Sequence, residues 1–360
     1  MSIEAHGGKP PEINWFAALC DDDYEYLGHS DPLLLSSWAH CRNIVLQAEQ
    51  GGFDGVLLPS GYQLGIDATI FAAAIAPMLQ RLRLLWAVRC GEDWPVQLAR
   101  RIATLDQLLE GRLMVNIISS ELPGEKLSGP ARYRRSAEVM QIVKILLAGK
   151  HLHHQGEFYT LDIDPPRIAT TKGTCPLLYF GGLSEEARET AAAHADVYLM
   201  WPDTMAQVKE TIADLAARAQ RLGRRLRFGY RVHVIVRDTE QEARASAVRL
   251  VSKLDDKTGS TIRNRSQDAQ SSGVARQAEL REVADNEGYI EEHLWSGIGR
   301  ARSGCGAAIV GNPDQVLAKL QAYQEAGIEA FILSGYPHQT ECDLFARHVL
   351  PRMAHQPLAG

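Results

Sequence analysis

One stretch of the sequence combines side chains that can bind an anion with a spacing that places them side by side. It reads Arg227-Phe-Gly-Tyr-Arg-Val-His-Val-Ile-Val236, so in a β-strand Arg231 and His233 point to one face and mostly apolar side chains to the other. In a parallel sheet both faces are buried, and a cationic pair on the inner face is costly unless an anion lies opposite. That anion is either a structural carboxylate, the commoner case for such a pair seen alone, or a bound substrate.

A glycine turn, Phe180-Gly-Gly-Leu-Ser-Glu-Glu, leads from a predicted strand into a predicted helix. The backbone amides of Leu183 and Ser184, together with the helix dipole, would suit a phosphate. An ordinary turn with Ser184 as the helix N-cap explains the same residues and is the commoner case. Asn116 stands near the end of another predicted strand, where its amide needs either a polar ligand or a backbone partner.

Three more candidates each have a simpler explanation. Trp201 and Tyr336 stand at predicted strand ends, where either packing or ligand contact accounts for them. Arg300 and Arg302 form a basic pair at the end of a polar segment, and such a pair is usually a solvated face.

These residues are positioned by short apolar strands that alternate with amphipathic helices. The alternation predicts a parallel sheet, and a count of eight core strands favours a closed TIM (β/α)8 barrel. We expect one domain over residues 1–360, with a short hairpin over 151–162 and a long polar insertion over about 255–304. Because that insertion is internal and weakly periodic, we expect a mobile lid before the last strand. All the candidates then fall at the C-terminal ends of the strands, where barrel active sites lie.

The composition excludes several classes of function. A chain of 360 residues with 45% hydrophobic residues and a net charge of −6 is not expected to bind nucleic acid or a membrane surface. Six cysteines without paired spacing indicate reduced thiols and no metal site. No apolar run approaches the length of a membrane span and there is no sign of export, so a cytoplasmic location is expected.

Several long motifs are similar to those of the bacterial luciferase-like, flavin-dependent monooxygenases, and within them to the alkanesulfonate monooxygenase group. The resemblance covers nearly the whole chain, and the motifs occur in the family's order. They are Ala103-Thr-Leu-Asp-Gln-Leu with Gly111-Arg-Leu-Met-Val-Asn-Ile, Arg132-Tyr-Arg-Arg-Ser-Ala-Glu, Leu178-Tyr-Phe-Gly-Gly-Leu-Ser, Arg227-Phe-Gly-Tyr-Arg-Val-His-Val-Ile-Val-Arg, Leu294-Trp-Ser-Gly-Ile-Gly and Leu333-Ser-Gly-Tyr-Pro-His.

The resemblance implies a TIM-barrel enzyme that receives reduced FMN (FMNH2) from a separate NAD(P)H-dependent flavin reductase and reacts with O2. It also implies an organosulfonate substrate that is oxidatively cleaved to an aldehyde and sulfite, with the oxygen chemistry supplied by the flavin. The family commonly forms dimers or tetramers, so a homo-oligomer is expected.

By the same resemblance, Arg231, His233 and Tyr336 correspond to catalytic residues, Trp201 to an active-site tryptophan and Arg302 to a catalytic arginine of the lid. A sulfonate spreads one negative charge over three oxygens, which a guanidinium fork matches. We therefore expect Arg231 and Arg302 to bind the sulfonate, with His233 and Trp201 completing the donor set. One of the arginines or His233 would also take the proton lost from carbon. The resemblance places FMN at a second set of residues: Asn116, Tyr133, Gly182, Leu183 and Ser184.

Three segments depart from the family pattern. The chain reads Pro59-Ser-Gly-Tyr-Gln-Leu-Gly where relatives carry a cysteine, Gly129-Pro-Ala-Arg-Tyr where they have a histidine, and Cys20-Asp-Asp-Asp-Tyr where they have a glycine-rich stretch. Extra acidic and polar groups suit hydroxyls, so a sulfonated sugar such as sulfoquinovose is as well supported as a simple alkanesulfonate. The alternatives are a monooxygenase of this family acting on a sulfone, amine or hydrocarbon, and a non-catalytic flavin-binding barrel.

Overall fold

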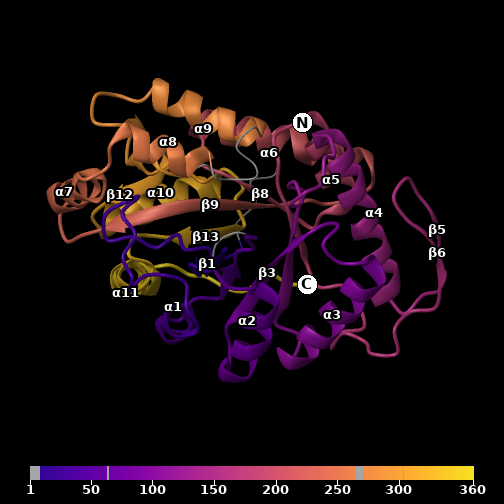
Figure 1. The fold of residues 1–360 in the computed structure, drawn as a ribbon. Helices are drawn as coiled ribbons and strands as arrows, with labels where there is room; N and C mark the ends of the chain where they lie inside the picture. The colour runs from indigo at the N-terminus through magenta and orange to yellow at the C-terminus, as the bar shows by residue number, and fades with distance from the viewer. Residues whose placement is uncertain (1–8, 63–64, 265–270, 303) are drawn as a thin grey trace.

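Eight parallel strands form a closed ring in the computed structural model, which describes residues 9–62, 65–264, 271–302 and 304–360. The ring closes because β9 pairs with β13 on one side and, through its first residues, with β8 on the other. The expected TIM barrel is therefore confirmed (Figure 1). Its strands are β1 (Glu12–Phe16), β2 (Gly55–Leu58), β3 (Arg83–Arg89), β4 (Leu113–Ile118), β7 (Leu178–Phe180), β8 (Val197–Met200), β9 (Arg227–Val236) and β13 (Ala330–Ser334).

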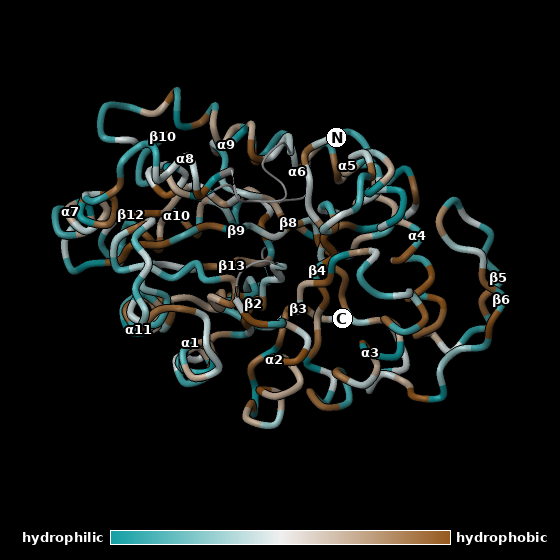
Figure 2. The backbone as a smooth tube through the Cα atoms, in the orientation of Figure 1, coloured by the Kyte–Doolittle hydropathy of each residue, from teal (hydrophilic) through white to brown (hydrophobic). Residues whose placement is uncertain are grey.

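Helices cover the outside of the barrel, and most begin at a side chain that accepts a hydrogen bond from a free backbone N–H of the first turn. Ser37 caps the first helix, because its side chain accepts a hydrogen bond from the His40 N–H. Hydrophilic and hydrophobic stretches alternate along these helices (Figure 2). The helices are α1 (Trp38–Gly51), α2 (Ala68–Ile75), α3 (Pro95–Leu108), α4 (Gly129–Leu147), α5 (Glu185–His194), α6 (Met205–Arg221), α7 (Glu240–Val251), α10 (Pro313–Glu325) and α11 (His338–His348).

The side chains of β9 divide between two layers, as the alternation predicts. Tyr230, Val232 and Val234 belong to the cluster that packs the barrel against its helices. Arg231 and His233 face the interior, beside the inward cluster that contains Phe16 and Ile332. Both are buried, with 3% and 0% of their surface exposed.

The insertion before the last barrel strand has more regular structure than its polar sequence suggests. Between α7 and β13 the chain forms α8 (Asp256–Asn264), α9 (Ser272–Glu282), β10 (Tyr289–Glu291), β11 (Leu294–Trp295) and β12 (Ala308–Gly311). β12 pairs with the second half of β9 outside the ring and carries β11 and β10 antiparallel to it. Residues 265–270 and 303 of the expected lid lie outside the described residues.

The smaller elements complete the fold. The expected hairpin is present as β5 (Leu152–Gln155) and β6 (Thr160–Ile163), and it stands out at one side of the barrel (Figure 1). Three 3₁₀ turns, η1 (Ala76–Met78), η2 (Gly297–Arg300) and η3 (Leu350–Arg352), connect other elements.

All six cysteines are free thiols, as expected. Within the described part of the chain, no helix is both long and apolar enough to cross a bilayer, and no group of three or more His, Cys, Asp or Glu side chains is arranged to hold a metal ion.

Candidate active site

Arg231 carries a buried positive charge that has no carboxylate partner among the described residues. Its Nη1 donates to the carbonyl oxygens of Val232 (3.1 Å) and Ile332 (3.4 Å), and its guanidinium carbon lies 4.3 Å from the centre of the Phe16 ring. Its Nη2 is buried and has no hydrogen-bond partner among the described residues. Burial lowers the pKa of Arg231 to about 10, so the group remains charged at neutral pH. The structural-carboxylate explanation of this arginine is therefore not supported.

His233 lies next to Arg231 and is held as a neutral imidazole. Its Nδ1 is 2.7 Å from Ser334 Oγ, and its ring stacks on that of Tyr336 with 5.1 Å between centroids. Burial, followed by the positive charges of Arg231 and Arg302, holds the pKa of His233 well below 6.5. Its Nε2 has no partner among the described residues, so it is free to contact a ligand.

Tyr336, which stacks on His233, is also in contact with Arg302. Arg302 Nη1 donates to the Tyr336 hydroxyl at 2.5 Å and to Asp22 Oδ2 at 2.9 Å. Four residues from different parts of the sequence thus form one cluster: Arg231, His233, Arg302 and Tyr336. The other basic residue of that segment, Arg300, lies outside it, donates to the carbonyl of Leu254 and is 42% exposed.

Two residues beside this cluster, His338 and Asp23, were not identified as site residues from the sequence. His338 is fully buried, its ring lies edge-on to Tyr336 at 5.0 Å, and its Nδ1 is 3.0 Å from Asp23 Oδ1. Its Nε2 lacks a partner within the described part of the chain. Burial alone would raise the pKa of Asp23, but the electrostatic interaction with His338 and the hydrogen bonds from His338 and His40 outweigh it and hold this pKa well below its usual range. His338 belongs to the Tyr-Pro-His motif, but Asp23 is 315 residues away in the sequence.

The three aspartates of the Cys20-Asp-Asp-Asp-Tyr segment differ in how many of their carboxylate oxygens accept hydrogen bonds from the protein. Asp21 accepts from the backbone of Ser36 and Gly65, and Asp23 is bonded to both histidines. Only Asp22 keeps a buried oxygen, Oδ1, without a partner in the described chain. We expected acidic groups of this segment to bind substrate hydroxyls, and among its three aspartates only Asp22 has an oxygen left for such a hydrogen bond. Residues 63–64 of the Pro59–Gly65 departure lie outside the described residues.

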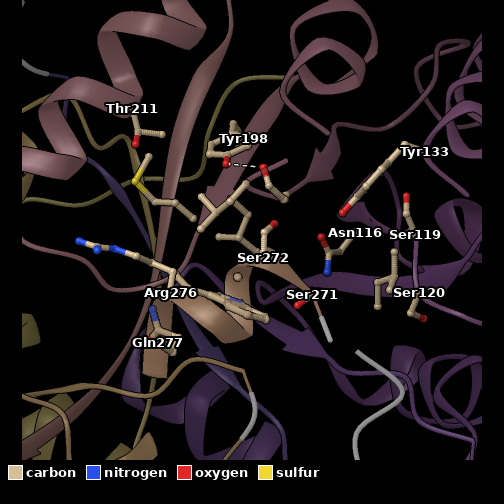
Figure 3. A pocket seen from close by; sticks show the side chains of 18 of the residues that line it. Asn116, Ser119, Ser120, Tyr133, Tyr198, Thr211, Ser271, Ser272, Arg276 and Gln277 are labelled. Atoms are coloured by element: carbon tan, nitrogen blue, oxygen red, sulfur yellow. Dashed lines mark hydrogen bonds between the residues drawn. The ribbon is translucent and has the colours of Figure 1, made fainter. Parts of the chain in front are cut away.

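A cavity of about 270 Å³ opens at the C-terminal ends of β4, β7 and β8. Four of the five residues expected at FMN line it, namely Asn116, Tyr133, Gly182 and Leu183. Ser184 does not line it: its hydroxyl accepts from the Ala187 N–H at 3.2 Å and caps α5, the commoner role for such a serine. Asn116, Tyr133, Ser119 and Ser120 lie on one side of the view, and Arg276 and Gln277 on the other (Figure 3).

Gly182 gives this cavity a wall that only glycine allows. Its φ is +148°, and a Cβ at this position would fall 2.6 Å from the Ala187 Cβ and 3.2 Å from the Tyr133 hydroxyl. The Gly182 carbonyl in turn accepts from the Tyr198 hydroxyl at 2.7 Å. The backbone can therefore approach a ligand closely here.

The polar insertion covers this cavity through α9. Arg276 forms a two-pronged ion pair with Asp203 (2.8 and 2.9 Å), and Gln277 donates to the Pro202 carbonyl at 2.8 Å. Trp201 also lines the cavity, and its ring lies against Gly273 of α9. Two polar residues of α9 thus bind partners on the barrel rather than pointing into solvent.

A family model described as luciferase-like monooxygenase matches residues 19–330. This chain belongs to the luciferase-like monooxygenase family. It is 66% identical to a sulfoquinovose monooxygenase of Novosphingobium aromaticivorans over 96% of this chain and 98% of that protein. It is 52% identical to one of Agrobacterium fabrum over 95% of this chain and 89% of that protein.

Solved structures share the fold at low sequence identity. Riboflavin lyase has a TM-score of 0.78 at 18% identity, over 98% of this chain and 94% of that one. Long-chain alkane monooxygenase has a TM-score of 0.75 at 20% identity, over 96% and 91%. The chain is thus an enzyme of the monooxygenase class, and the recognition of the family from its motifs is confirmed.

Proposed function

We propose that this monooxygenase uses reduced FMN and O2 to cleave the carbon–sulfur bond of a sulfonated sugar, releasing sulfite and leaving an aldehyde. The observation that carries the proposal is the buried charge of Arg231, which no described carboxylate neutralises. The names of two relatives with 66% and 52% identity favour sulfoquinovose over a simple alkanesulfonate. A separate NAD(P)H-dependent reductase would supply the flavin.

The sulfonate would be held by groups whose polar atoms are otherwise unoccupied. Arg231 Nη2 would donate to one sulfonate oxygen, and His233 Nε2–H to another, with His233 Nδ1 accepting from the Ser334 hydroxyl. Arg302 would add a second guanidinium, and Trp201 an indole N–H. Tyr336 positions both Arg302 and His233 through its hydroxyl and its ring.

The cavity at β4, β7 and β8 is lined by side chains that can hydrogen-bond to a flavin and by a glycine that allows a close backbone approach. Asn116 and Tyr133 would contact the flavin, and Gly182 and Leu183 would let its phosphate approach the backbone ahead of α5. Reduced flavin would supply the activation of O2. The insertion over residues 255–304 would act as the lid, with α9 keeping water from the cavity.

The test is an assay that follows both sulfite and the oxidised carbon product. Sulfite should appear with sulfoquinovose only when FMN, a flavin reductase, NAD(P)H and O2 are all present. Each component is omitted in turn, and catalase is added to remove free hydrogen peroxide as a cause. Hexanesulfonate, dimethyl sulfone, an amine and an alkane are tested alongside. Turnover of one of the last three without sulfite from any sulfonate would replace the proposal, and flavin binding without any product would indicate a non-catalytic barrel.

A further inference from the structure

Asp22 contacts the cluster through only one of its two carboxylate oxygens. It lies in the loop after β1, where its Oδ2 accepts from Arg302 Nη1 at 2.9 Å. Its Oδ1 is buried and has no donor in the described part of the chain, although the side chain as a whole is 17% exposed. A buried carboxylate oxygen without a donor is costly, so this position favours a ligand that brings one.

We propose that Asp22 Oδ1 accepts a hydrogen bond from a hydroxyl of the substrate and thereby selects hydroxylated sulfonates over alkanesulfonates. The inference rests on the proposed function, because it places the sulfonate beside Arg302. Asp22 Oδ2 is hydrogen-bonded to Arg302, the arginine that would bind the sulfonate, so Asp22 Oδ1 lies next to the sulfonate position. A hydroxyl on a carbon near the sulfonated one can then reach it.

The charges of the cluster agree with this arrangement. Arg302 is paired with Asp22, whereas the guanidinium of Arg231 has no carboxylate partner among the described residues and is available for the single negative charge of a sulfonate. An alkyl chain would leave Oδ1 buried without a donor, and that unpaired acceptor discriminates against it more strongly than lost contact area would.

The experiment is a double-mutant cycle in which one change is made in the enzyme, at Asp22, and the other in the substrate, by removal of one hydroxyl. Wild type and Asp22→Asn are compared on sulfoquinovose and on its 2-, 3- and 4-deoxy analogues, by kcat/KM for sulfite release and by calorimetric Kd without flavin. For one deoxy position, the wild type should lose about 10- to 100-fold, the range for a hydrogen bond to a charged group. In Asp22→Asn, removal of the same hydroxyl should lower kcat/KM and affinity by less than about 3-fold, because the carboxylate that the hydroxyl would bind is no longer there.

Glu25→Gln is the matched control for loss of one carboxylate from the same loop. Glu25 is 41% exposed and pairs with Arg249, so this variant should retain the wild-type response to every analogue. Circular dichroism and thermal unfolding confirm that Asp22→Asn is folded, and Asp22→Ser serves if it is not.

Each outcome decides the assignment. An equal loss in wild type and variant for every analogue would overturn it, because Asp22 would then act only through Arg302. So would a wild type that tolerates all three deletions. If no sulfonate yields sulfite, the proposed function fails, yet the calorimetric cycle still decides whether Asp22 reads a hydroxyl. Absence of any sulfo-sugar binding would overturn both.

Discussion

At the N-terminal end of the barrel, Glu12 is fully buried and both of its carboxylate oxygens are occupied by protein donors. Oε1 accepts from Arg83 (2.7 Å) and from the Leu358 N–H (3.1 Å), and Oε2 accepts from the Tyr179 hydroxyl (2.7 Å) and the Asn14 amide (3.0 Å). At the C-terminal end, Arg231, His233 and His338 are equally buried, and each keeps one nitrogen without a described partner.

The contrast between the two ends of the barrel distinguishes residues that stabilise the fold from residues that can bind a ligand. A buried ion pair within the chain holds its two partners in place, whereas an unsatisfied buried donor costs free energy that a bound ligand can recover. Both clusters face the same barrel interior, so the difference does not come from the scaffold. It agrees with the general division of barrels into a stabilising N-terminal face and a functional C-terminal face.

The largest effect is expected at the N-terminal end. Arg83→Met removes the cation and leaves Glu12 buried beside an apolar side chain, which should lower the free energy of unfolding by about 3–5 kcal/mol. Urea denaturation followed by circular dichroism measures this loss. Sulfite release per folded molecule should stay within about twofold of wild type, and a marked fall at constant stability would show that the two ends are not independent.

The same substitution on the facing strand should behave in the opposite way. Arg231→Met deletes a charge that no carboxylate in the described part of the chain pairs with, so we expect the free energy of unfolding to change by less than about 1 kcal/mol or to rise. The kcat/KM for sulfite release should fall by roughly 30- to 4,000-fold, since truncating a buried charged contact to a ligand costs about 2–5 kcal/mol. Near-normal turnover, or a stability loss like that of Arg83→Met, would contradict the assignment of Arg231 to the substrate.

A smaller effect is expected in the flavin cavity. In Gly182→Ala the new methyl group would collide with Ala187 and press on Tyr133, and we expect FMN to bind about 5- to 100-fold more weakly, the equivalent of about 1–3 kcal/mol of overpacking. Fluorescence titration with FMN measures it. Gly149→Ala is the control, because Gly149 also has a positive φ (+70°) but nothing lies within 4 Å of its added Cβ. Equal effects of both variants on FMN affinity would remove Gly182 from the site.

Local sequence patterns predicted the barrel and the inward face of β9 because both depend on short-range periodicity. Arg231 and His233 are two residues apart, so the strand geometry alone brings them together. The Asp23–His338 and Asp22–Arg302 pairs join residues about 300 positions apart, and no local pattern contains that information. The family motifs located Arg302 and Tyr336 but not the carboxylate that holds one of them.

The polar insertion shows a second limit of prediction from the sequence. The sequence around α9 has little apolar periodicity because this helix is held by polar contacts, from Arg276 to Asp203 and from Gln277 to Pro202. Hydrophobic patterning detects helices that bury an apolar face, so it missed this one. Conversely, the Ser184 turn was already better explained as an N-cap, and the structure has it in that role.

The smallest effect should appear in the pH dependence of stability. Because His233 is buried beside Arg231 and Arg302, its folded-state pKa lies well below 6.5, while the unfolded chain takes up a proton near that pH. Its contribution is therefore fully present above pH 6.5 and is lost as the pH falls toward the folded pKa, by about 1.4 kcal/mol at pH 5.5. His233→Gln, which cannot titrate, should lose that much less stability between pH 7 and pH 5.5, as measured by urea unfolding.

His194, whose pKa burial lowers to about 4, is present in both proteins, so its contribution cancels. Parallel stability curves for wild type and variant would mean that His233 is protonated in the folded state and is not the neutral donor of the sulfonate site. A bound sulfonate would offset the positive field of the two arginines. Saturating sulfonate should therefore reduce the acid-induced loss of stability in wild type, after subtraction of the change that it causes in His233→Gln.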